Sequence, residues 1–229
     1  MCRMNLQGYQ KVTLLDYPGL VACTVFSGGC NLRCPFCHNA GLVRTPMAEA
    51  NAYEAVMAYL TARRGILQGV CVTGGEPLLQ PDLPEFLRKL KDMGYRVKLD
   101  TNGALPKKLA AALATGCIDY VAMDIKHAPD SYPKATGCDL DFAPFEESIR
   151  ILKNSGLPYE FRTTAVKGIH KIEDFDTIAA YLGDEAYFIQ KFVDSGNLLG
   201  QGCSAFSYDE MQLILSTARN HTPRAALRG

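Results

Sequence analysis

No hydrophobic run in this 229-residue sequence is long enough to cross a bilayer, which takes roughly 20 consecutive apolar residues. The amino-terminal segment also lacks the apolar core of a secretion signal. An excess of charge of one sign is missing too, because 24 Lys and Arg residues balance 24 Asp and Glu residues. No broad basic field would therefore attract nucleic acid or an anionic membrane. These absences predict a cytoplasmic protein with no nucleic-acid or membrane partner.

Repeats of fixed length, low-complexity tracts and long linkers are absent as well, so a single domain over residues 1–229 is expected. Nine cysteines are present. Structural disulfides rarely persist in a reducing compartment, so these thiols are expected to bind metal or to serve as small apolar side chains. The six that lie far apart in the sequence, and that we expect to pack or to lie at the surface, are Cys2, Cys23, Cys71, Cys117, Cys138 and Cys203.

Strand patterns alternate with helix patterns along most of the chain. Short apolar runs predict strands at residues 20–26, 69–73, 96–100, 120–125, 159–166 and 187–192. Apolar residues at helical spacing predict helices at residues 47–63, 83–93, 106–115, 145–154 and 172–182. About six strand-helix units predict an α/β fold, a partial (β/α)6 TIM-like barrel with its chemistry at the carboxyl ends of parallel strands. Residues 221–229 are expected to form a frayed tail.

Three cysteines lie close together in a loop after the first predicted strand. Cys30, Cys34 and Cys37 fall within eight residues, and no fourth cysteine is near. Three thiolates on a four-iron cluster would leave one iron open to a ligand, which a closed structural zinc site lacks. A zinc site or a redox dithiol remains the alternative, because similar spacings occur in other metal-binding loops.

Polar motifs follow three further predicted strands. Residues 74–77 (GGEP) would bring backbone carbonyls close to a ligand ammonium, or form an ordinary turn. Residues 100–103 (DTNG) offer acceptors for an amine, ribose hydroxyls or a small cation, or form an Asx-turn. Asp124 and Lys126 share one strand face and could bind a ligand together, or form an ordinary ion pair. Arg162, among apolar neighbours, needs an acidic or carbonyl partner.

The cysteine motif C-x-x-x-C-x-aromatic-C, with Phe36 as the aromatic residue, resembles that of the radical S-adenosylmethionine (SAM) superfamily. LLDYPG at residues 14–19, FSGGCNLRCPFCHN at residues 26–39 and TGGEP at residues 73–77 resemble glycyl-radical-enzyme activases, most closely the activating proteins of anaerobic ribonucleoside-triphosphate reductases. The resemblance implies a radical SAM core over about residues 16–195 and a carboxyl-terminal extension over residues 196–229.

The resemblance also implies the cofactors and the residues that hold them. A four-iron, four-sulfur (4Fe-4S) cluster would be ligated by Cys30, Cys34 and Cys37, and some activases add a monovalent cation. Asp16 would hold the glycyl loop of a partner enzyme, although an Asp before Tyr-Pro-Gly could also start a turn. The residues implied to contact SAM are Phe36, Gly74, Gly75, Glu76, Asp100, Asn102, Asp124, Lys126, Arg162 and Gln190.

The implied activity is reductive cleavage of SAM to a 5'-deoxyadenosyl radical that removes a glycine α hydrogen from anaerobic ribonucleoside-triphosphate reductase. A flavodoxin or ferredoxin-type protein would donate the electron. Two departures stand out: residues 165–168 (AVKG) replace the usual Val-Pro-Gly, and Gln190 stands where the family often has a His. The alternatives are a pyruvate formate-lyase activase or a deazapurine synthase, and, from a different class, a non-catalytic metal-binding or redox module.

Overall fold

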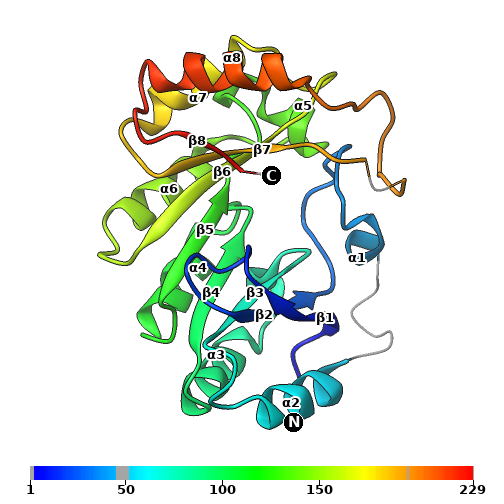
Figure 1. Ribbon diagram of the computed structural model, residues 1–229, viewed down its shortest axis with the longest axis vertical. Helices are drawn as coiled ribbons and strands as arrows, with labels where there is room; N and C mark the ends of the chain where they lie inside the picture. The colour runs from blue at the N-terminus through cyan, green and yellow to red at the C-terminus, as the bar shows by residue number, and fades with distance from the viewer. Residues whose placement is uncertain (1–2, 45–51, 195, 229) are drawn as a thin grey trace. The chain divides into compact units, whose positions relative to one another are not determined.

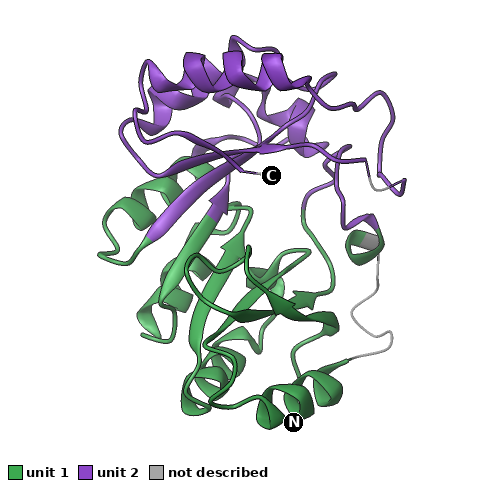
Figure 2. Ribbon diagram, in the orientation of Figure 1, with its two compact units in different colours: residues 1–31, 41–122, 144–158 green, residues 32–40, 123–143, 159–229 purple. Residues whose placement is uncertain are grey.

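The computed structural model describes residues 3–44, 52–194 and 196–228. Contacts between residues divide the chain into two compact units, shown in different colours in Figure 2. The first unit comprises residues 1–31, 41–122 and 144–158. The second unit comprises residues 32–40, 123–143 and 159–229. The expectation of a single domain stays a prediction.

The first unit is built on strands that follow one another in chain order across the sheet. They are β1 (Leu6–Thr13), β2 (Ala22–Ser27), β3 (Gly69–Gly74), β4 (Arg96–Thr101) and the start of β5 (Tyr120–Asp124). Strands β2, β3 and β4 run parallel, whereas β1 pairs with β2 in the antiparallel direction. The predicted strands of this unit are confirmed, and β1 is an addition that the sequence analysis did not make.

Helices pack on these strands through amphipathic faces. The unit contains α2 (Tyr53–Ala62), the 3-10 helix η1 (Pro77–Leu79), α3 (Leu83–Asp92), α4 (Pro106–Ala114) and most of α6 (Ala143–Lys153), while α1 (Ala40–Arg44) begins at its boundary. In α3 the residues Leu83, Phe86, Leu87 and Leu90 are buried, which is helical spacing. Residues 47–51 of the predicted helix 47–63 lie outside the described part of the chain.

The second unit contains strands β6 (Tyr159–Ala165), β7 (Tyr187–Lys191) and β8 (Ala226–Arg228), which are parallel neighbours. Its helices are η2 (Pro129–Ser131), α5 (Tyr132–Thr136), α7 (Asp174–Leu182) and α8 (Tyr208–Arg219). Figure 1 shows α7 and α8 side by side on one side of these strands. A capping box between Ser207 and Glu210 begins α8, because each side chain bonds the backbone N–H of the other residue.

The expectation of a frayed tail at residues 221–229 is wrong. Residues 226–228 form β8, and the Arg228 guanidinium donates two hydrogen bonds of 2.6 and 2.8 Å to the carboxylate of Glu160 on β6. Glu160 is fully buried, so the ion pair supplies the charge partner that this carboxylate needs. The tail is ordered because it satisfies a buried charge that the sequence analysis had not connected with it.

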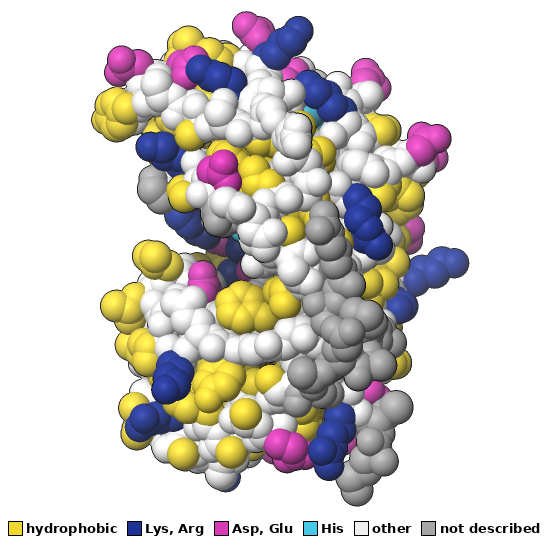
Figure 3. Space-filling view, turned by 90° about the vertical axis from the view of Figure 1, so that its right-hand side faces the viewer, with side chains coloured by type: hydrophobic (Ala, Val, Ile, Leu, Met, Phe, Trp, Pro, Cys, Tyr) yellow, Lys and Arg dark blue, Asp and Glu magenta, His cyan; other side chains and the backbone are white. Residues whose placement is uncertain are grey.

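Strands and helices therefore alternate as predicted, and the α/β class with parallel strands in chain order, as in a partial barrel, is confirmed. No helix in the described ranges is both long and apolar enough to cross a bilayer. On the face shown in Figure 3, positive and negative side chains are interspersed among the described residues.

Candidate functional site

The cysteine loop contains the three clustered cysteines, and none of the three is in a disulfide bond. Cys30 belongs to the first unit, and Cys34 and Cys37 belong to the second. Within the second unit, the backbone N–H of Cys37 donates to the carbonyl of Cys34 at 3.1 Å, which closes a tight turn around Phe36. The Phe36 side chain is buried, with its ring centroid 6.3 Å from that of His170.

Two glycines that the sequence analysis did not identify pack closely against this loop. The Gly200 N–H donates to the carbonyl of Pro35 at 2.8 Å, and a Cβ at Gly200 would lie 2.6 Å from the Pro35 Cβ. Gly137 has a positive φ of 65°, and a Cβ there would lie 2.2 Å from the Arg33 carbonyl oxygen. Only glycine allows both close approaches. These contacts link residues far apart in the sequence, so no local motif reveals them.

The loop after β3 lies against the end of β2 and the first cysteine. Gly75 donates its N–H to the Ser27 carbonyl at 2.9 Å, and Glu76 donates its N–H to the Gly29 carbonyl at 2.9 Å. A Cβ at Gly75 would lie 1.9 Å from the Gly29 oxygen and 3.4 Å from the Cys30 Cβ. Gly74 has a φ of 120°, and its added Cβ would lie 2.3 Å from the Ser27 nitrogen. The two glycines thus permit a backbone contact that side chains would prevent.

The Glu76 carboxylate ties this loop to the end of β4. It is fully buried and accepts hydrogen bonds from the Leu78 N–H at 3.1 Å, the Thr101 hydroxyl at 2.9 Å and the Asn102 N–H at 2.7 Å. Three donors of this kind satisfy a buried carboxylate. A direct contact of Glu76 with SAM stays a prediction.

Asn102 connects the DTNG segment to the cysteine loop. Its side-chain amide nitrogen lies 2.9 Å from the Asn31 Oδ1 atom and 3.8 Å from the Cys30 sulfur. Its Oδ1 atom accepts the N–H of Ala104 at 2.9 Å, which is the expected Asx-turn. The turn fixes the side chain, and the amide N–H groups therefore point at the first cysteine and its neighbour.

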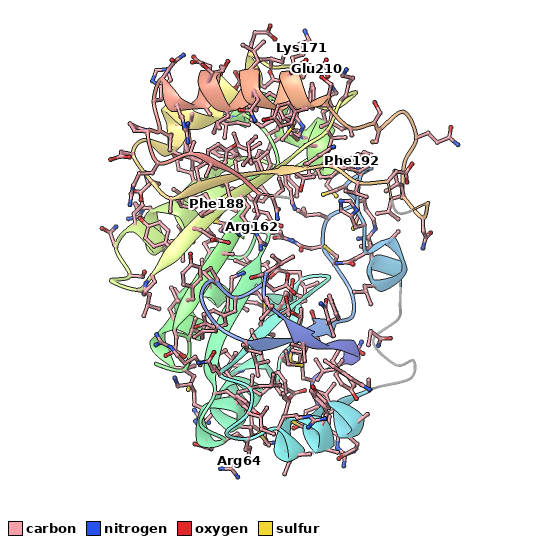
Figure 4. All side chains as sticks on the ribbon, in the orientation of Figure 1. Arg64, Arg162, Lys171, Phe188, Phe192 and Glu210 are labelled. Carbon is pink, nitrogen blue, oxygen red and sulfur yellow. The ribbon has the colours of Figure 1, made fainter. Side chains whose placement is uncertain are left out.

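Asp124, Lys126 and Arg162 form one charged cluster in the second unit. The Asp124 carboxylate lies 2.9 Å from the Lys126 ammonium and 2.9 Å from the Arg162 guanidinium. Burial alone would raise the pKa of Asp124, but the two cations outweigh it and hold the pKa well below its usual range. Arg162, labelled in Figure 4, lies on β6 and pairs in register with Phe188 on β7. Two cations around one anion leave this cluster with an excess positive charge.

Two buried histidines, His127 and His170, lie next to this cluster. The His170 Nε2 atom lies 2.8 Å from the Lys126 carbonyl oxygen, and the Val166 N–H donates to the His170 Nδ1 atom at 3.2 Å. The rings of His170 and His127 stack with centroids 4.8 Å apart. Burial lowers the pKa of His170 to about 4, so this ring is neutral near pH 7. Both histidines are buried and have hydrogen-bond partners, as core residues do.

The remaining predicted residues have defined neighbours. Gln190 on β7 pairs in register with Thr164 of β6 and with Arg228 of β8. The Asp16 carboxylate accepts a hydrogen bond from the Thr24 hydroxyl, and the Asp16 N–H donates to the Thr13 hydroxyl at 3.1 Å. Asp16 therefore lies in the turn between β1 and β2, at the end of β2 away from Cys30. The ligand roles of these residues stay predictions.

The described side chains do not form a binding site for a single metal ion. Among residues 3–44, 52–194 and 196–228, no group of three His, Cys, Asp or Glu side chains gathers closely enough to hold a single metal ion. The three cysteines nevertheless suit an iron-sulfur cluster, because their thiols lie within eight residues of the sequence, none is in a disulfide, and an amide N–H points at one of them.

Comparisons with known proteins show what this chain resembles. Residues 24–182 match the radical SAM superfamily. The chain is 31% identical to a Methanocaldococcus jannaschii protein provisionally named a glycyl-radical enzyme activating enzyme, over 82% of this chain and 79% of the relative. It is 29% identical to 7-carboxy-7-deazaguanine synthase of Methanopyrus kandleri, over 74% of each chain. The crystal structure of a radical SAM methyltransferase from Sphaerobacter thermophilus has the same fold, with a TM-score of 0.75 and 14% identity over 95% of this chain and 68% of the other.

Proposed function

Because this chain belongs to the radical SAM superfamily, we propose that it is the activase of a glycyl radical enzyme, removing an α hydrogen from a glycine of its partner. Membership makes the chain a radical SAM enzyme that uses a three-cysteine 4Fe-4S cluster and SAM, which decides against a non-catalytic module. The observation that carries the activase function is the 31% identity to a protein named as such an activase, over about four fifths of both chains. The partner that we favour is an anaerobic ribonucleoside-triphosphate reductase, with a flavodoxin or ferredoxin-type electron donor.

The cluster and SAM supply the electron transfer and the radical when they are bound, and the chain's residues hold and orient them. We assign the three iron ligands to Cys30, Cys34 and Cys37, since three thiolates on three of the four irons leave the fourth iron open to a ligand. The Asn102 amide, 3.8 Å from the Cys30 sulfur, donates to that ligand. Such hydrogen bonds tune the reduction potential of a cluster.

The amino acid end of SAM carries one ammonium and one carboxylate, and we assign a partner for the ammonium in the first unit and a partner for the carboxylate in the second. Gly74 and Gly75 let their loop pack closely on β2 and Gly29, because a side chain at either position would collide there. Backbone carbonyls of this loop are the acceptors that we assign to the ammonium. The Asp124, Lys126 and Arg162 cluster has one positive charge in excess, which suits a carboxylate. These roles explain why the polar residues lie at the carboxyl ends of different strands.

Asp16 is the residue that we assign to the partner peptide. It directly follows Leu14 and Leu15, which are 69% and 79% exposed, and it precedes the Tyr17-Pro18-Gly19 turn. Exposed leucines beside a polar anchor are suited to an extended peptide segment. The hydrogen bond from Thr24 fixes the carboxylate in place before a partner binds.

A small-molecule substrate is the second candidate, because identity to the deazaguanine synthase reaches 29% over 74% of each chain. The two functions differ in whether SAM cleavage needs a protein partner. The enzyme should be reconstituted anaerobically with iron and sulfide, reduced, and assayed for 5'-deoxyadenosine with and without a candidate anaerobic reductase. Product formation together with a glycyl radical signal on the reductase supports the activase, and product without that signal rejects it.

The matched variants for this assay are Cys34→Ala and Cys117→Ala. Both side chains are 8% exposed, but only Cys34 belongs to the clustered motif. Cys34→Ala should abolish SAM cleavage, because it removes an iron ligand, and Cys117→Ala should leave it unchanged. Retained cleavage in Cys34→Ala would refute the assignment of the ligands.

A further inference from the structure

A lysine is buried beside the acidic residue of the DTNG segment. The Lys98 ammonium nitrogen lies 2.8 Å from the Oδ1 atom of Asp100, and the Lys98 side chain has no exposed surface. Both residues lie on β4, and successive side chains of a strand point to opposite faces, so Lys98 and Asp100 share a face. The buried carboxylate thus already has a cationic partner within its own strand.

Side chains on the two neighbouring strands lie beside the Lys98 ammonium. Cys71 on β3 pairs in register with Lys98 and offers a thiol. The aromatic ring of Tyr120 on β5 lies 6.0 Å from the ammonium nitrogen. Hard cations bind several oxygen atoms in a shell, and a thiol and a ring face are poor substitutes. A second positive charge next to a buried ammonium would also be repelled strongly, because screening by solvent is weak there.

The sequence had suggested a monovalent cation at residues 100–103, and the geometry does not fit one at the Asp100 Oδ1 atom. We propose that the Lys98 ammonium takes the place of a monovalent metal ion beside Asp100, so that SAM binds this enzyme without dependence on potassium or sodium ions. The inference rests on the proposed function, since it concerns the cofactor site of that enzyme. Lys98 acts through Asp100 and is therefore a positioning residue.

The ion pair between Lys98 and Asp100 affects the site because of where Asp100 lies in the chain. Asp100 directly precedes Thr101 and Asn102, which bind Glu76, and Asn102 reaches the Cys30 sulfur. An Asp100 carboxylate without a partner would be costly to bury and would shift to find one. Lys98 therefore sets the position of the segment that joins the GGEP loop to the first cysteine.

The first test needs no variant. The affinity of the reconstituted, oxidised enzyme for SAM should be measured by equilibrium dialysis in potassium, sodium and choline chloride at equal ionic strength. Oxidised protein does not turn over, so the reading is binding alone. The proposal expects dissociation constants that agree within about twofold. Binding that is tenfold or more tighter in potassium or sodium than in choline would overturn it.

Variants make the test sharper, because removing one partner of a buried ion pair leaves the other uncompensated. Lys98→Ala vacates space beside Asp100, and SAM affinity should become at least about tenfold tighter in potassium than in choline chloride. Lys98→Met removes the charge but fills the space, so its affinity should fall in every salt. Lys107→Ala, at an exposed lysine on α4, is the control and should behave as the wild type.

Thermal unfolding gives a second reading that does not involve SAM. The unfolding midpoint of Lys98→Ala should rise in potassium relative to choline chloride, whereas the wild-type midpoint should not change. An equal midpoint of Lys98→Ala in both salts, together with equal SAM affinities, would overturn the proposal. If the wild type bound no SAM in any salt, the proposed function would fail, and the unfolding comparison would still decide the role of Lys98.

Discussion

Gly75→Ala is the substitution whose effect the structure defines most closely. The added Cβ would lie 1.9 Å from the Gly29 carbonyl oxygen and 2.6 Å from the Gly29 carbonyl carbon. No positive φ is required at Gly75, so the cost is steric and does not come from backbone conformation. The carbonyl would have to retreat by more than about 1 Å to restore van der Waals separation. That movement breaks the 2.9 Å hydrogen bond from the Glu76 N–H to the same oxygen.

The expected loss of stability follows from the steric clash and the broken hydrogen bond. Forcing an extra carbon into a packed site costs about 1–3 kcal/mol. A lost backbone hydrogen bond adds about 1 kcal/mol. The free energy of unfolding should therefore fall by about 2–4 kcal/mol. Because Gly29 directly precedes Cys30, the displacement also reaches the first iron ligand, and SAM cleavage should fall more than stability alone explains.

Gly8→Ala is the matched control, because nothing lies within 4 Å of the Cβ that it would add, and no positive φ is required there. Urea unfolding should give the stability of both variants, and 5'-deoxyadenosine formation after anaerobic reconstitution should give their activity. The control should match the wild type in both measurements. A Gly75→Ala variant that also matched the wild type would refute the argument that this contact excludes a side chain.

Three further predictions concern other parts of the fold. Arg228→Met should lower the free energy of unfolding by about 3 kcal/mol in urea titrations, because it removes both hydrogen bonds and the positive charge of Arg228 from the buried Glu160 carboxylate; no loss would show that the pair is not formed. His170 has a folded pKa of about 4, below the ordinary value of 6.5, so the unfolded chain binds a proton first as pH falls. This difference in pKa should lower the free energy of unfolding by about 2 kcal/mol between pH 7.5 and pH 5. The decrease over the same pH range should be smaller in His170→Gln. Asn102→Ala should make the cluster reduction potential more negative in redox titrations, because Cys30 loses a hydrogen-bond donor, and an unchanged potential would contradict this role.

The sequence predicted well where local patterns carry the information. The buried runs of β2 to β7 and the five longer helices between them follow from periodicity, because one face of each element must be covered. The short helices α1 and α5 were not predicted. The capping box Ser207-x-x-Glu210 was available as a signal for α8 but was not used. Strand β8 was missed because it is only three residues long.

The parts of the site that were not predicted depend on contacts between distant residues. Nothing local to Gly200 shows that it packs on Pro35, and nothing local to Arg228 shows that it pairs with Glu160. Lys98 is different, because its partner is two residues away and alternation along a strand places both on one face. A lysine among the apolar residues of a buried strand is itself a signal, because its charge needs a partner.

The central claim is that this enzyme removes a glycine α hydrogen from a partner protein. The most direct test is to supply a candidate anaerobic reductase whose glycines carry deuterium at the α carbon, and to analyse the 5'-deoxyadenosine by mass spectrometry. The proposed function predicts product that has gained one deuterium and a reductase that carries a glycyl radical. Product without deuterium, formed at the same rate with and without the reductase, would contradict it.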